Sequence, residues 1–112
     1  MKIYHNPRCG KSRETLKMLE ENASNFEIVE YLKNPPSYAE LKDVLMKLNM
    51  NASDIVRKTE AIYKDRFKGK DFSEEEWIQV MIEYPKLIER PIVVRNNKAV
   101  IGRPPENVRQ LF

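Results

Sequence analysis

The stretch KIYHNPRCGKSRETLKMLEE, residues 2–21, carries a strand pattern and a helix pattern on either side of a single cysteine. Residues 2–5 are typical of a short strand, and the Asn-Pro pair that follows is a turn signal. Residues 12–21 favour a helix, because two leucines lie three positions apart on one side. The pattern therefore places Cys9 at a strand-to-helix junction.

The next apolar stretch completes a strand, helix, strand unit. Residues 26–32, FEIVEYL, are rich in β-branched and aromatic side chains and end at an Asn-Pro-Pro sequence that neither a strand nor a helix continues through easily. This order and spacing predict a βαβ unit with a right-handed crossover and two parallel strands.

The middle of the chain is predicted to be helical. Ser37 with Glu40 and Ser73 with Glu76 have the spacing of capping boxes, and apolar residues at helical spacing follow each pair. Between these two helices we expect a shorter helix around 51–59 and a polar connecting loop over 63–72.

The end of the chain returns to a strand pattern. Residues 91–102, PIVVRNNKAVIG, contain two apolar runs joined by an Asn-Asn pair that tolerates positive φ, which predicts a β-hairpin. A short helix should follow, with Pro104 in its first turn. We therefore expect one α/β domain over 1–112, a mixed sheet built from a βαβ unit and a hairpin, with a helical insertion at about 37–86 and a C-terminal α-helix.

Composition sets limits on the kind of protein. The chain has 112 residues, 41% of them hydrophobic and 33% charged, with a net charge of +3 and both signs interspersed. This balance gives no indication of nucleic-acid binding, and no apolar run reaches the roughly 18 residues that a membrane span needs. The N-terminus lacks an apolar stretch of signal-peptide length, so we expect a cytoplasmic protein without membrane contact. We also expect a monomer.

The only cysteine, Cys9, has two possible roles. A lone thiol is commonly a small buried hydrophobic group. Here, however, Arg8 and Lys11 flank it at a predicted helix start, where backbone N–H groups and cationic side chains favour the thiolate and also bind oxyanions. With no second cysteine, an internal disulfide and a Cys/His zinc site are excluded, and we expect no metal.

The residues after Cys9 exclude two familiar thiol sites. A C-x-x-C pair is absent because Ser12 occupies the fourth position, so any second thiol must come from another molecule. A phosphatase-like loop, with an arginine six positions after the cysteine, is absent because that position is Thr15. His5, the single histidine, is a candidate general base or supporting residue.

Two arginines also stand out by position. Arg90 precedes Pro91 at a predicted strand start, and Arg103 precedes Pro104 at a predicted helix start. Either guanidinium could project toward an oxyanion as a planar, multiple hydrogen-bond donor.

Five motifs in register identify a family resemblance over essentially the whole chain. They are YHNPRCGKSR at 4–13, YLKNPPS at 31–37, VRKTE at 56–60, ERPIVV at 89–94 and IGRPPE at 101–106. Together they resemble the glutaredoxin-dependent arsenate reductase family, which has a thioredoxin-like fold, and in particular its shorter branch, which lacks a C-terminal extension. Arg8 and Lys11 depart from the small or neutral residues that well-characterised members carry beside the cysteine, and they are expected to tighten oxyanion binding.

The resemblance implies roles for particular residues. Cys9 would be the catalytic nucleophile, and an oxyanion site would be completed by Arg57, Arg90 and Arg103; spacing alone had not selected Arg57. His5 and Ser12 would tune the cysteine, and Pro91 would be the cis proline that the thioredoxin-like fold places beside it.

The resemblance also implies the partners. Cys9 would attack arsenate, glutathione as co-substrate would reduce the thiol-arsenic adduct to arsenite, and glutaredoxin would clear the mixed disulfide, with no bound cofactor. Two alternatives stay open. One is a redox-responsive regulator that binds RNA polymerase, although such regulators typically sense through a C-x-x-C pair. The other is a general glutathione-dependent thiol oxidoreductase.

Overall fold

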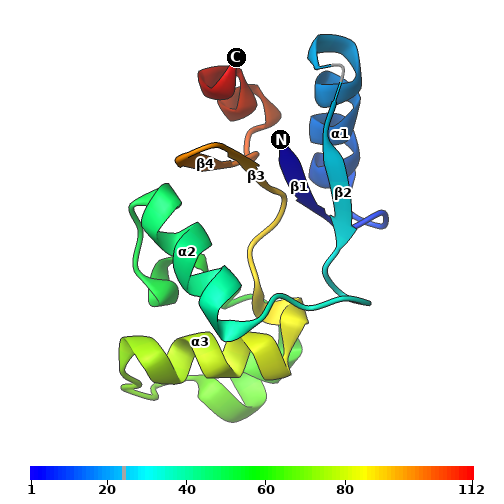
Figure 1. The fold of residues 1–112 in the computed structure, drawn as a ribbon. Helices are drawn as coiled ribbons and strands as arrows, with labels where there is room; N and C mark the ends of the chain where they lie inside the picture. The colour runs from blue at the N-terminus through cyan, green and yellow to red at the C-terminus, as the bar shows by residue number, and fades with distance from the viewer. Residues whose placement is uncertain (24) are drawn as a thin grey trace. The chain divides into compact units, whose positions relative to one another are not determined.

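The computed structural model of the chain describes residues 1–23 and 25–112, which form two compact units (Figure 1). The sheet unit comprises Met1–Pro35 and Arg90–Phe112, and the helical unit comprises Pro36–Glu89. No helix among the described residues has the length and apolar character needed to cross a bilayer.

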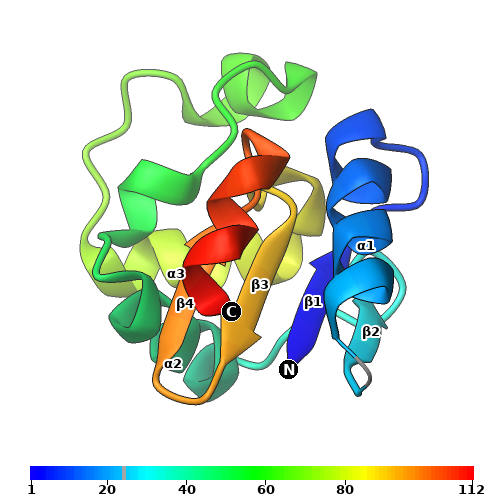
Figure 2. The same ribbon diagram turned by 90° about the horizontal axis from the view of Figure 1, so that it is seen from above.

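The sheet unit contains four strands in the order β2-β1-β3-β4 (Figure 2). They are β1 (Lys2–His5), β2 (Glu27–Glu30), β3 (Ile92–Arg95) and β4 (Lys98–Ile101). Strand β1 pairs with β2 in parallel, whereas β1 with β3 and β3 with β4 are antiparallel. This confirms the predicted mixed sheet.

Strand β2 is shorter than the apolar run that predicted it. It ends at Glu30 because the backbone N–H groups of Lys33 and Asn34 both donate to the Glu30 carbonyl oxygen at 3.0 Å, which turns the chain before the prolines. The hairpin between β3 and β4 forms as predicted, with Asn96 in the left-handed region at φ 55°.

Two helices belong to the sheet unit. Helix α1 (Gly10–Asn22) begins directly after Cys9, which is its N-cap residue, and the C-terminal helix η4 (Pro105–Leu111) is of the 3-10 type. The α-helix expected at the C-terminus is thus replaced by the tighter form, and Pro105, not Pro104, is its first residue. This helix has only seven residues and Pro105 supplies no N–H donor, so few i to i+4 bonds can form; the Asn107 N–H instead donates to the Pro104 oxygen at 3.1 Å.

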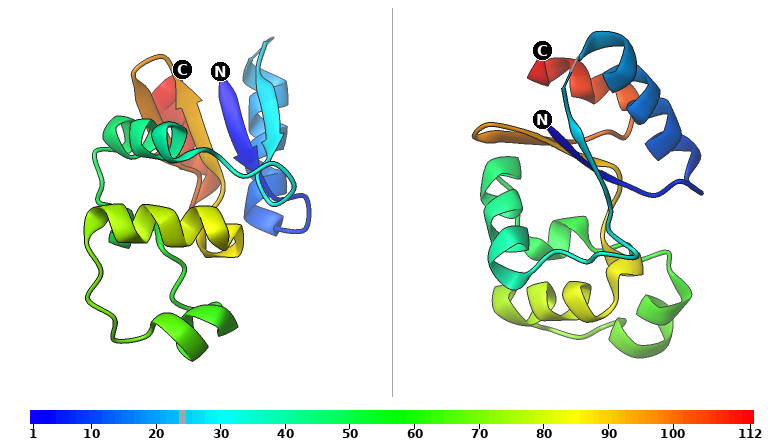
Figure 3. Two further views of the ribbon diagram at one scale, coloured as in Figure 1. Left: turned by 60° about the horizontal axis from the view of Figure 1, so that its bottom comes forward. Right: turned by 45° about the vertical axis from the view of Figure 1, so that its right-hand side comes forward.

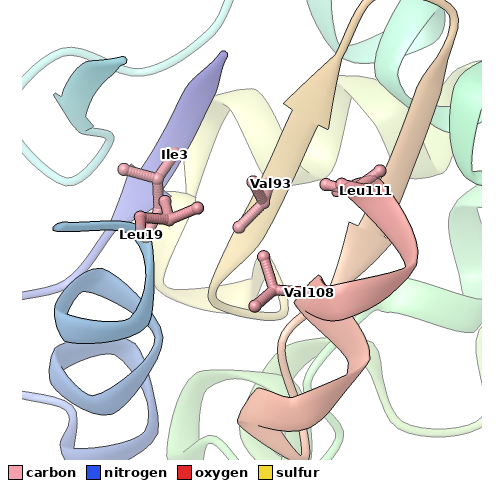
Figure 4. Close-up of a cluster of buried hydrophobic side chains, with 5 residues drawn as sticks. All are labelled: Ile3, Leu19, Val93, Val108 and Leu111. Atoms are coloured by element: carbon pink, nitrogen blue, oxygen red, sulfur yellow. The ribbon is translucent and has the colours of Figure 1, made fainter. Parts of the chain in front are cut away.

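One hydrophobic cluster fixes α1 and η4 to the sheet (Figure 4). Ile3 of β1 lies opposite Val93 of β3 in the register, so both side chains emerge on the same face. Leu19 of α1, and Val108 and Leu111 of η4, pack against them, and all five are buried. Helix α1, which has Cys9 as its N-cap, is therefore anchored on β1 and β3.

The helical unit contains α2 (Tyr38–Leu48), α3 (Glu74–Glu83) and three short helical turns, η1 (Ala52–Ile55), η2 (Tyr63–Phe67) and η3 (Pro85–Leu87) (Figure 3). Both predicted helix starts are confirmed, since the Ser37 and Ser73 hydroxyls accept the N–H groups of Glu40 and Glu76.

The helix predicted around 51–59 is shorter than expected. It ends at Ile55, because Val56 forms an antiparallel bridge with Ile88. The neighbouring bonds, from Arg57 N–H to the Leu87 oxygen at 2.7 Å and from Glu89 N–H to the Ile55 oxygen at 2.8 Å, hold this segment extended.

The loop predicted over 63–72 was wrong in part. Residues Tyr63–Phe67 form a π-helical turn, closed by the Lys68 N–H on the Tyr63 oxygen at 2.9 Å. The turn buries Phe67, whose ring meets the Trp77 ring edge-on at 6.3 Å. This tertiary contact outweighs the polar composition of the segment.

Candidate active site

Hydrogen bonds within the loop between β1 and α1 fix the position of Cys9. The Cys9 N–H donates to the Asn6 carbonyl oxygen and the Arg8 N–H to Asn6 Oδ1, both at 3.0 Å. Cys9 has extended backbone angles, and its side chain makes no capping bond to α1. Cys9 is buried, with 8% of the residue exposed, and it lies at the positive end of the helix dipole without forming a capping bond.

One arginine lies at the sulfur. Arg103 Nη1 is 3.7 Å from Cys9 Sγ, within hydrogen-bonding distance for a sulfur acceptor. Arg103 follows β4 and stands in the short connection to η4, an exposed position. A guanidinium at this distance can bind both a thiolate and an oxyanion that reacts with it.

His5 and Ser12 also meet, beneath the same loop. His5 Nδ1 lies 2.6 Å from Ser12 Oγ, and that oxygen accepts the Asn6 N–H at 3.0 Å. The Ser12 hydroxyl can therefore donate its proton to Nδ1 of a neutral imidazole. Burial lowers the pKa of His5 below 6.5; the Glu30 carboxylate opposes this shift and Arg13 adds to it.

The lowered pKa of His5 predicts a loss of stability in mild acid. Below about pH 6.5, unfolded chains bind a proton at His5 that folded chains do not, so the free energy of unfolding falls as the pH drops. The variant His5→Asn keeps a polar side chain there but cannot take up this proton. Between about pH 7.5 and about pH 5.5, the urea midpoint should fall further for the original chain than for the variant. An equal fall in both chains would contradict the assignment of this loss to His5.

Gly102 connects α1 to the hairpin beside this site. Its N–H donates to the Pro91 oxygen at 2.8 Å, and its oxygen accepts the Thr15 hydroxyl at 3.3 Å. A Cβ at Gly102 would come within 2.7 Å of Thr15 Oγ1 and 2.9 Å of Pro91 Cγ. Only glycine fits here without displacing its neighbours. This close approach holds Gly102, and with it the start of the connection that carries Arg103, against α1.

Sequence reasoning had missed the structural roles of Thr15 and Gly102. Thr15 had served only to exclude a phosphatase-like loop, although it lies fully buried at the contact between α1 and the end of β4. The one available signal was a glycine directly before the selected Arg103, and nothing local linked it to residue 15.

The remaining predicted residues are placed as follows. The Arg90–Pro91 peptide bond is cis, as the resemblance implied, and Arg90 is partly buried at the start of β3. Arg57 belongs to the helical unit, where it pairs with Glu60 at 3.0 Å and with Glu89 at 3.6 Å. The structure thus brings together Cys9 with Arg103 and His5 with Ser12.

Residues 4–111, which include the cysteine loop and Arg103, match the ArsC family. The chain belongs to the ArsC family. It is 41% identical to the arsenate reductase of Neisseria meningitidis (strain MC58), over 100% of this chain and 97% of that protein. It is 52% identical to a protein of Escherichia coli K12 named "Uncharacterized protein YfgD", over 99% of this chain and 95% of that one.

A solved structure shows the same fold. The arsenate reductase from Vibrio cholerae is 43% identical and superposes with a TM-score of 0.93, covering 100% of this chain and 98% of that chain. The fold is therefore the thioredoxin-like fold of the ArsC family, as the sequence motifs had implied.

Proposed function

We propose that this ArsC family chain is an arsenate reductase that uses Cys9 as its nucleophile and glutathione with glutaredoxin as its source of electrons. The observation that carries the proposal is the contact between Arg103 Nη1 and Sγ of Cys9, the N-cap residue of α1. It joins a nucleophile to an oxyanion-binding group at a helix N-terminus. The arsenate reductases among the relatives support arsenate as the oxyanion.

The first proposed step forms a bond between sulfur and arsenic. The Cys9 thiolate attacks arsenic(V), and one arsenate oxygen leaves as water after protonation. Arg103 stabilises the negative charge on the remaining oxygens, since its guanidinium lies beside the sulfur. Arg57 and Arg90 are proposed as further oxyanion ligands from the family resemblance, with His5, Ser12 and Pro91 as supporting residues.

The second and third steps return the electrons. A glutathione thiolate attacks Cys9 Sγ, a disulfide forms, and the electron pair of the sulfur-arsenic bond passes to arsenic, which leaves as arsenite. Glutaredoxin then attacks the glutathione sulfur and releases the Cys9 thiolate. The chain contains one cysteine, so the other thiols must be supplied by these partners.

A coupled assay tests the proposal. The purified chain with arsenate, glutathione, glutaredoxin, glutathione reductase and NADPH should oxidise NADPH at a rate that depends on the chain and on arsenate. Omission of glutathione should stop the reaction. Absence of any arsenate-dependent rate above the chain-free control would refute the proposal, and reduction of a glutathione mixed disulfide without arsenate would instead support a general thiol oxidoreductase.

A further inference from the structure

We propose that Arg8 and Lys11 select the reductant of Cys9 by charge, so that an anionic thiol of the glutathione class reacts in preference to a neutral or cationic one. This inference rests on the proposed function, because it concerns the molecule that attacks Cys9 after arsenate. It assigns a specificity role to two side chains that the mechanism above does not use.

The cations around Cys9 fall into two groups. Two of them are engaged within the protein: Arg103 Nη1 contacts the sulfur, and Arg13 Nη1 donates to the Pro7 oxygen at 3.0 Å. The Arg8 side chain is exposed and makes no ion pair or hydrogen bond with any residue that the structure describes. Its backbone N–H, by contrast, is bound to Asn6 Oδ1, so the guanidinium extends from a fixed point next to Cys9.

Lys11 is nearly as available as Arg8. It lies in the first turn of α1, two residues after Cys9, and its Nζ is 3.9 Å from Glu14 Oε2. Both side chains are about half exposed, and an ion pair this long and this exposed is easily exchanged for a pair with a ligand. Arg8 and Lys11 thus flank Cys9 in the sequence with charges that a ligand can reach.

The exposure of Cys9 determines where a reductant must lie. Cys9 is buried, with only 8% of the residue exposed, so only the thiol end of a reductant can contact it and the rest of that molecule must lie over the surrounding surface. Glutathione carries carboxylates at both ends, and these would extend over the loop surface near the cationic groups. At such short range, within a Debye length of about 8 Å, salt screens the attraction only partly.

Disulfide exchange on Cys9 measures this selection without arsenate. The Cys9 thiolate attacks one sulfur of a small disulfide, a mixed disulfide forms, and the leaving thiolate takes the electron pair of the broken bond. Because the chain has one cysteine, intact mass reports the product at a single site. The probes are oxidised glutathione, which is anionic, and cystamine, which is cationic, and the readout is the ratio of their second-order rate constants.

The original chain should favour the anionic probe, and the double variant Arg8→Gln, Lys11→Gln should lower the ratio by about 10-fold. Raising the salt from about 0.02 M to about 0.5 M should lower the ratio for the original chain but change it little for the double variant. The matched control is Lys17→Gln, an exposed lysine on the same helix about 10 Å along the axis from Gly10, which should leave the ratio unchanged.

Three results would overturn the proposal: a ratio that is the same in the original chain and the double variant, an equal fall in the Lys17 variant, or a Cys9 that reacts with neither probe. An effect of the double variant on the arsenate KM alone would assign Arg8 and Lys11 to the oxyanion and also overturn it. The expected ratios together with no arsenate reduction would refute the proposed function and leave the charge selection at Cys9 standing.

Discussion

The variant Cys9→Ser should lose arsenate-dependent NADPH oxidation by at least about 10³-fold, because a hydroxyl cannot replace a thiolate in attack on arsenic or in disulfide formation. Removal of an attacking nucleophile in other enzymes costs on the order of 10⁶ in rate. The assay with glutathione and glutaredoxin described above measures this loss, and treatment of the original chain with iodoacetamide should produce the same loss through the only thiol.

The same variant should fold normally, which separates loss of chemistry from loss of structure. Cys9 occupies the N-cap of α1 without a capping bond, and serine is a preferred residue at this position. We therefore expect the free energy of unfolding to stay the same or to rise by up to about 1 kcal/mol. Activity that survives Cys9→Ser would contradict the proposed mechanism; a variant that fails to fold would contradict the assigned cap.

The variant Leu19→Ala should have the largest effect on stability, a loss of about 2–5 kcal/mol. Leu19 is fully buried against Ile3 and Val93, where α1 meets the sheet, and alanine would leave a cavity in this cluster. Urea unfolding followed by circular dichroism measures the loss as a lower midpoint with little change in slope.

The matched control for Leu19 is Leu16→Ala on the same helix. Leu16 is only partly buried at the edge of the cluster, so its truncation should cost clearly less. Equal losses for the two variants would show that Leu19 does not anchor α1. Because α1 begins directly after Cys9, a weaker anchor should also loosen the segment that holds this residue. Arsenate should then protect Cys9 from alkylation less well in Leu19→Ala than in the original chain.

Elements with a strong local signal were predicted well. The Ser73 and Glu76 capping box forms as expected, because the two groups that bond lie three residues apart and need no distant partner. The hairpin formed for the same reason, since Asn96 can adopt the positive φ that a short connection requires.

Elements governed by distant contacts were predicted poorly. The turn at Tyr63–Phe67 exists because Phe67 packs on Trp77, and the short helix at Ala52–Ile55 ends where Val56 pairs with Ile88. In both cases the deciding partner belongs to another element, Trp77 to α3 and Ile88 to the segment after η3, so the pattern of the segment itself does not reveal the contact.

The sequence by itself determined that one thiol stands at a helix start among cations, and that any second thiol must come from another molecule. Both conclusions depend only on residue identity and near spacing. The tertiary structure alone decided which groups meet: Arg103 lies 94 positions from Cys9 and reaches its sulfur, and Gly102 packs on Thr15. The physical reason is the strand order, because β3 pairs with β1 and returns the end of the chain to the loop where it began.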